Sequence, residues 1–70
     1  MDKDVIQVLE RIRQLRVERN LSILELATRA NISHSYLFYL ESKRKVPSLT
    51  VLFQLARALE IPIRKFFESS

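Results

Sequence analysis

The stretch that decides the fold is SILELATRANISHSYLFYLES, which covers residues 22–42. Ser22 lies three residues before Glu25, and this spacing predicts a capping box at the start of a helix. Ser33 caps a second helix, and Asn31 before it suits the left-handed conformation that ends a helix. The stretch therefore predicts two short helices joined by a tight turn, at about 22–30 and about 34–42.

The two helices each have one face that packs inward. On the first, the small residues Ala27 and Ala30 let the second helix cross at close range, as a helix-turn-helix unit requires. On the second, Leu37 and Leu40 point inward. The outer face of the second helix then carries no carboxylate and consists of His34, Ser35, Phe38 and Tyr39. Such a face can approach an anionic surface without charge repulsion.

The rest of the chain continues the helical pattern. Apolar residues at spacings of three and four predict a first helix over about 4–19, which Asn20 ends. Ser48 caps a fourth helix, and Pro62 opens a short fifth one. We therefore expect an all-α bundle of five helices in a single domain over residues 1–70, with the helix-turn-helix unit at about 22–42.

Length and composition limit what this domain can be. A chain of 70 residues buries only a small core, so tight helix packing or self-association has to stabilise it. There is no cysteine or glycine and the one histidine is His34, so we expect no disulfide, no metal site and no cofactor. Without a long apolar run or a signal-peptide core, the chain is expected to be cytoplasmic, with no membrane partner. The net charge of +4 favours an anionic partner.

One ordered set of residues extends over nearly the whole chain, from about Arg11 to Phe67. It consists of Ile12-Arg13-Gln14-Leu15-Arg16, Leu21-Ser22, Glu25-Leu26-Ala27, Ile32-Ser33, Ser35-Tyr36-Leu37, Glu41 and Pro47-Ser48-Leu49. This set resembles the phage repressor and Cro-type (XRE-like) helix-turn-helix regulators. The resemblance implies a lambda-repressor-like fold and a sequence-specific regulator of transcription from a bacterium, plasmid or phage. It also implies a homodimer on a palindromic operator in double-stranded DNA, with residues 33–42 in the major groove.

The resemblance assigns DNA contacts to particular residues. The start of the third helix would read base edges through His34, Ser35, Phe38 and Tyr39. His34 and Ser35 can form hydrogen bonds with bases, and Phe38 can contact a thymine methyl group. Phosphate contacts would come from helix starts, a tyrosine hydroxyl and a basic turn, namely Ser22, Ile23, Ser33, Tyr36, Lys43, Arg44, Lys45 and Ser48. The family usually has glutamine at the position of Ile23, so here only the backbone N–H can contribute.

Two further features of the family have counterparts here. An arginine at the end of the first helix pairs with a glutamate at the end of the third, and Arg16 and Glu41 match them, which implies a structural ion pair. The family also favours glycine at the positions of Asn20, Asn31 and Lys43. Asparagine tolerates a left-handed backbone, whereas Lys43 either carries about 1 kcal/mol of strain or ends its helix differently.

Apolar residues gather near the end of the chain. Some of them must cover the core, and the excess is expected to form a twofold dimer interface, for which the candidates are Ile61, Ile63, Phe66 and Phe67. The alternative is that all four close the core of the monomer.

Other functions on the same fold are open at this point. The chain could be a protein-interaction module, such as an antitoxin or adaptor, with an exposed apolar patch for a protein partner that consists of Ile23, Leu24, Phe38 and Tyr39. DNA affinity with a steep salt dependence would count against this alternative. A regulator could also contact RNA polymerase, and a controller of a restriction–modification gene pair is one compact form. An enzyme is disfavoured, because the carboxylates are spread over helix surfaces and no nucleophile–base arrangement is present.

Overall fold

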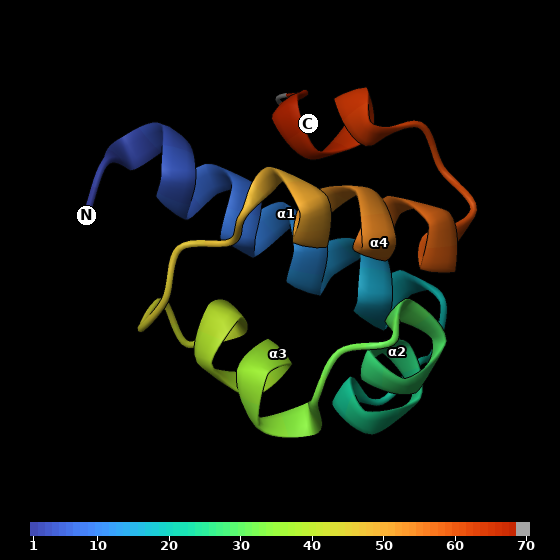
Figure 1. The fold of residues 1–70 in the computed structure, drawn as a ribbon. Coiled ribbons are helices and arrows are strands. Elements are labelled where there is room, and N and C mark those ends of the chain that lie inside the picture. The colour runs from blue at the N-terminus through green and yellow to red at the C-terminus, as the bar shows by residue number, and fades with distance from the viewer. Residues whose placement is uncertain (69–70) are drawn as a thin grey trace.

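The computed structural model describes residues 1–68 and is all-helical (Figure 1). In chain order the elements are α1 (Lys3–Glu18), α2 (Ile23–Ala30), α3 (His34–Glu41), α4 (Leu49–Leu59) and the 3-10 helix η1 (Ile63–Phe67). The predicted all-α class is confirmed. The prediction of five α-helices is corrected at the last element, which is a 3-10 helix. A segment of five residues suits this tighter helix, since 3-10 geometry is used for short pieces.

The four α-helices begin at side chains that cap them. The hydroxyl oxygens of three serines each accept a backbone N–H three residues ahead, at 3.0 to 3.1 Å, and these are Ser22, Ser33 and Ser48. At α2 the Ser22 N–H also donates to the Glu25 carboxylate at 2.8 Å, which completes the predicted capping box. The start of α1 is capped by Asp2, which accepts the Asp4 N–H at 2.7 Å. Local sequence therefore determines where these helices start.

Left-handed residues end the helices or the turns that follow them. Among residues 1–68, positive φ angles of 57 to 64° occur at Asn20, Asn31, Lys43 and Glu60. The two asparagines were predicted from their tolerance of this conformation, and Lys43 adopts the left-handed backbone for which the family prefers glycine. Glu60 was not predicted, because nothing in its side chain favours this region.

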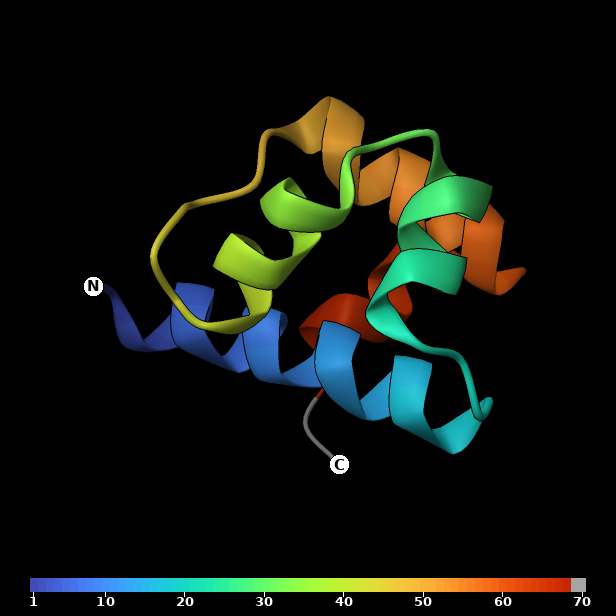
Figure 2. The same ribbon diagram turned by 90° about the horizontal axis from the view of Figure 1, so that it is seen from below.

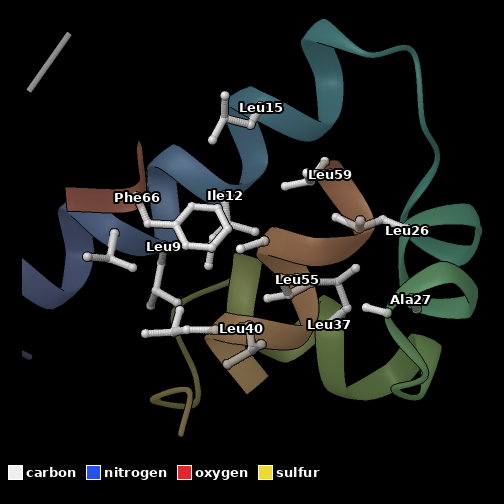
Figure 3. Packing of buried hydrophobic residues seen from close by; sticks show 14 of the residues in the cluster. Leu9, Ile12, Leu15, Leu26, Ala27, Leu37, Leu40, Leu55, Leu59 and Phe66 are labelled. Carbon is white, nitrogen blue, oxygen red and sulfur yellow. The ribbon is translucent and has the colours of Figure 1, made fainter. Parts of the chain in front are cut away.

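The core is a single apolar cluster to which all five elements contribute (Figure 3). Its buried members are Val8, Leu9, Ile12, Leu15, Leu21, Leu26, Ala27, Ala30, Leu37, Leu40, Leu52, Leu55, Ala56, Leu59 and Phe66. Figure 3 shows the ring of Phe66 beside Leu9 and Ile12 of α1. At 0% exposure Phe66 is the largest fully buried side chain, so the prediction that it faces a dimer partner does not hold in this structure.

The arrangement of the helices separates α3 from the end of the chain. α2 packs against both α3 and α4, while η1 packs against α1 and α4. In Figure 1, α3 and α2 lie below α1 and α4, and η1 lies above them. Figure 2, seen from below, therefore has α3 in front and η1 behind. The outer face of α3 is left open on one side of the molecule, and η1 lies on the other.

Candidate nucleic-acid interface

The outer face of α3 is an exposed surface without acidic residues in its first turn. Leu37 and Leu40 are fully buried and fix the inner face of the helix against the core. The four candidate base-reading residues all lie on the exposed side, and these are His34, Ser35, Phe38 and Tyr39. The division between core and surface on α3 is therefore the one that the sequence predicts. We call these four residues the reading face.

The basic turn after α3 folds back over the aromatic rings of that helix. The Lys45 ammonium lies 5.7 Å from the ring centroid of Tyr36 and 5.8 Å from that of Tyr39. The Arg44 guanidinium lies 5.9 Å from the Tyr39 ring, which also meets Phe38 edge-on at 5.8 Å. These distances are within the range of cation–π attraction. Sequence reasoning missed this cluster, although aromatic residues directly before a basic run could have indicated it.

Lys43 differs from its two basic neighbours. Its ammonium lies 3.3 Å from the Glu10 carboxylate, so it is directed towards α1, and Figure 2 shows the turn curving beside the N-terminal half of that helix. Both partners are exposed, and such pairs contribute little stability. Of the three predicted phosphate-binding cations, Arg44 and Lys45 therefore lie next to the reading face, whereas the Lys43 side chain is directed towards Glu10 of α1.

The helix starts differ in how well they suit an anion. The first N–H groups of a helix have no partner within the helix and attract negative charge. At the start of α2 these N–H groups lie next to the Glu25 carboxylate, which repels an anion. The pKa of Glu25 is lowered from its ordinary value, chiefly because the Ser22 backbone N–H donates to the carboxylate. α4 has no acidic residue in its first turn, so Ser48 marks the more favourable anion site. Ile23 is half-buried against the core, which leaves only its backbone for such a role.

Arg16 and Glu41 form the ion pair that the resemblance implies. The guanidinium donates to both carboxylate oxygens at 2.8 Å, in a two-pronged arrangement, and donates a third hydrogen bond of 2.8 Å to the Leu21 carbonyl. The two side chains are only 11% and 5% exposed. The hydrogen bonds to Glu41 raise the pKa of Arg16 above its ordinary value despite the burial. The pair joins the end of α1 to the end of α3 and so fixes the orientation of the reading face.

The candidate dimer residues are divided between core and surface. Ile61 and Ile63 are half-buried against the core, and Phe67 is 55% exposed. An apolar groove runs next to Phe67 and is lined by Val5, Val8, Val46, Pro47 and Leu52. Leu49 and Phe53, one turn apart on α4, are also exposed. Although Phe66 is buried in the core and is no longer a candidate for the interface, apolar surface remains at this end of the molecule.

Other kinds of site find no support in the part of the chain that the structure describes. None of its helices has the length and apolar character that crossing a membrane requires. No group of three or more His, Asp or Glu side chains gathers there in a way that could hold a metal ion.

Comparison with known proteins identifies the family. The model of the helix-turn-helix family matches residues 12–66, from α1 to the buried ring in η1. This chain belongs to the helix-turn-helix family. The match covers the reading face, the Arg16–Glu41 pair and the basic turn together.

A curated relative agrees with this assignment. The immunity repressor protein of Bacillus phage phi105 is 44% identical over 54 residues, which are 77% of this chain and 38% of that protein. The resemblance to phage repressors is therefore confirmed. The chain spans less than half the length of the curated relatives it matches.

Two solved structures have the same fold. The restriction–modification controller protein C.AhdI of Aeromonas hydrophila superposes with a TM-score of 0.89 and 32% identity, covering 94% of this chain and all of that one. SinR, a master regulator of biofilm formation from Bacillus subtilis, was solved in complex with DNA. It matches with a TM-score of 0.81 and 29% identity over 87% of this chain and 98% of that one.

Proposed function

We propose that this chain is a sequence-specific regulator of transcription that binds double-stranded DNA with α3 in the major groove. The observation that carries the proposal is the reading face, which is exposed, free of acidic residues in its first turn, and bordered by Arg44 and Lys45. The matching SinR chain in complex with DNA and the phage immunity repressor support it.

Within this proposal the residues of the reading face have different tasks. His34 and Ser35 form hydrogen bonds with base edges at the start of α3. Phe38 gives apolar contact to a thymine methyl group, and Tyr39, the next residue of α3, reaches the same groove. Each fully used base contact distinguishes the right base by about 1–3 kcal/mol.

Phosphate contacts hold the protein in register on the duplex. We assign them to the starts of α3 and α4 at Ser33 and Ser48, to the Tyr36 side chain, and to the cations Arg44 and Lys45. Ser22, Ile23 and Lys43 are weaker candidates, since carboxylates of Glu25 and Glu10 lie beside them.

We further propose that the protein acts as a homodimer on a palindromic site. Ile61, Ile63 and the exposed Phe67 remain as candidate interface residues, and the exposed Leu49 and Phe53 on α4 extend the apolar surface. A twofold dimer of this kind would place its two reading helices about 34–36 Å apart, one turn of DNA. Sedimentation at high micromolar concentration tests this, and a species that is only monomeric would refute it.

Selection of bound duplexes from a random pool tests the proposed function. The selected duplex should bind with an affinity that falls steeply with salt, because phosphate neutralisation releases counterions. Combined replacement His34→Ala, Ser35→Ala and Phe38→Ala should abolish the preference for that duplex over a scrambled one. The matched control is Arg64→Gln on η1, which is on the opposite side of the molecule from α3. An unchanged preference in the triple variant would refute the assignment.

A further inference from the structure

One lysine of the basic turn is shared between two aromatic rings. Tyr36 and Tyr39 are three residues apart on α3 and so lie on neighbouring parts of its surface. The Lys45 ammonium is within 6 Å of both ring centroids, at 5.7 and 5.8 Å. Because one small cation faces two rings, its position along α3 is restricted more closely than a single contact would restrict it.

The backbone of the turn is held at the place that this arrangement needs. The Lys43 N–H donates to the Leu40 carbonyl at 3.1 Å, and the Arg44 N–H donates to the Tyr39 carbonyl at 2.9 Å. The left-handed Lys43 reverses the chain, and its side chain extends towards Glu10 of α1. The backbone that leads to Lys45 is therefore held to the end of α3 by these two hydrogen bonds.

We propose that Tyr36 and Tyr39 are positioning residues, which hold the Lys45 ammonium at the border of the reading face ready for a DNA phosphate. The proposal rests on the DNA-binding function proposed above. A lysine carries three N–H donors, and rings that cover part of the ammonium leave donors on its other side for a phosphate. Ordering a long side chain costs entropy, and a side chain already ordered in the free protein does not add that cost to binding.

This assignment differs from a hydroxyl contact between the tyrosines and DNA. If the rings do the positioning, Tyr→Phe replacements keep the effect and Tyr→Leu replacements lose it. If the hydroxyl groups are what matters, both kinds of replacement weaken binding. The two explanations can therefore be separated by paired variants at the same positions.

The first test uses the free protein. In its NMR spectrum the side-chain methylene protons of Lys45 next to the ammonium should resonate upfield of those of Lys3, because the rings shield them. The variant Tyr36→Phe, Tyr39→Phe should keep this shift, and the variant Tyr36→Leu, Tyr39→Leu should remove it. The single replacement Tyr39→Leu, at an exposed position, should reduce it without risk to the fold. An unshifted Lys45, or one indifferent to the leucine variants, overturns the proposal whether or not the protein binds DNA.

The second test measures affinity for the selected duplex by fluorescence anisotropy. The double leucine variant should bind about threefold to tenfold more weakly, the cost of ordering one long side chain. Its salt dependence should keep the wild-type slope, whereas Lys45→Gln should lower the slope by about one. In the Lys45→Gln background the leucine replacements should cost clearly less than in the wild type, because only direct contacts of the tyrosines with DNA remain to be lost. A loss of the same size in that background would mean that the tyrosines act directly on DNA, and would overturn the proposal.

Discussion

Replacement of Glu41 by glutamine tests the structural role of the Arg16–Glu41 pair. The change keeps the shape of the side chain but removes its charge and one of its two acceptor oxygens. The guanidinium would then keep two acceptors, the Leu21 carbonyl and the amide oxygen of the glutamine. Breaking one partner of a buried pair costs about 3–5 kcal/mol, because the other charge is left without compensation. Arg16 is 11% exposed and keeps its third hydrogen bond, which places the expected loss near the low end, at about 3 kcal/mol.

A loss of this size is large for so small a domain. At about 0.05–0.15 kcal/mol per residue, a chain of this length has a total stability of about 3.5–10 kcal/mol. The expected fall in Tm is roughly 12–24 °C, since each kcal/mol shifts a small domain by about 4–8 °C. Urea denaturation followed by far-ultraviolet circular dichroism measures the change as a lower midpoint at an unchanged slope.

Two further variants make this reasoning refutable. The double replacement Arg16→Met, Glu41→Leu removes both charges together and should fold within about 1 kcal/mol of the wild type, or more stably. Glu10→Gln, which breaks the exposed pair with Lys43, should cost less than about 1 kcal/mol. The pair is not the coupled, buried contact described here if Glu41→Gln costs no more than Glu10→Gln. The same follows if the double variant loses the sum of the losses measured for Arg16→Met alone and Glu41→Leu alone.

Three other replacements follow from the helix ends. Glu60→Gly should raise stability by about 1 kcal/mol in thermal denaturation, because glycine adopts the left-handed backbone at no steric cost; an unchanged or lower Tm would contradict this. Ser33→Ala should lower stability by about 1 kcal/mol through loss of the cap on the Tyr36 N–H, while the neighbouring Ser35→Ala should have almost no effect; equal effects would refute the capping role. The pKa of Glu25 is lower in the folded protein than in the unfolded chain, so its contribution is present above about pH 4.3 and is lost as the pH falls through the folded pKa. When the pH is lowered from about 6 to about 3, the free energy of unfolding should therefore fall less for Glu25→Gln than for the wild type. An equal fall in both proteins would contradict the lowered pKa of Glu25.

Much of the fold could be predicted because its signals are local. The caps at Ser22, Ser33 and Ser48 each involve one side chain and a backbone group three residues away. The asparagine turns depend on the tolerance of a single residue for the left-handed region. The Arg16–Glu41 pair is different, since 25 residues separate the partners and only the family resemblance could bring them together.

The features that escaped prediction depend on the assembled fold. Glu60 is left-handed because α4 ends there and the Ile61 N–H returns to the Ala56 carbonyl, and the residue type gives no sign of this. The apolar pattern could not show which of Phe66 and Phe67 is buried, because both belong to the same apolar run near the end of the chain. Only the packing of the core decides which ring is enclosed. The contacts of Lys45 with two rings depend on the backbone reversal at Lys43.

The enclosed ring of Phe66 has a consequence for the order of events during synthesis. The ring packs beside Leu9 and Ile12, so the last element of the core completes a surface that the first helix exposes from the start (Figure 3). On the ribosome, which makes the chain from its N-terminus, α3 and α4 can pack against α1 before η1 is made, and only the side of α1 that Phe66 covers has to wait. A nascent chain stopped before residue 66 would therefore leave that side of α1 uncovered and open to chaperones and proteases.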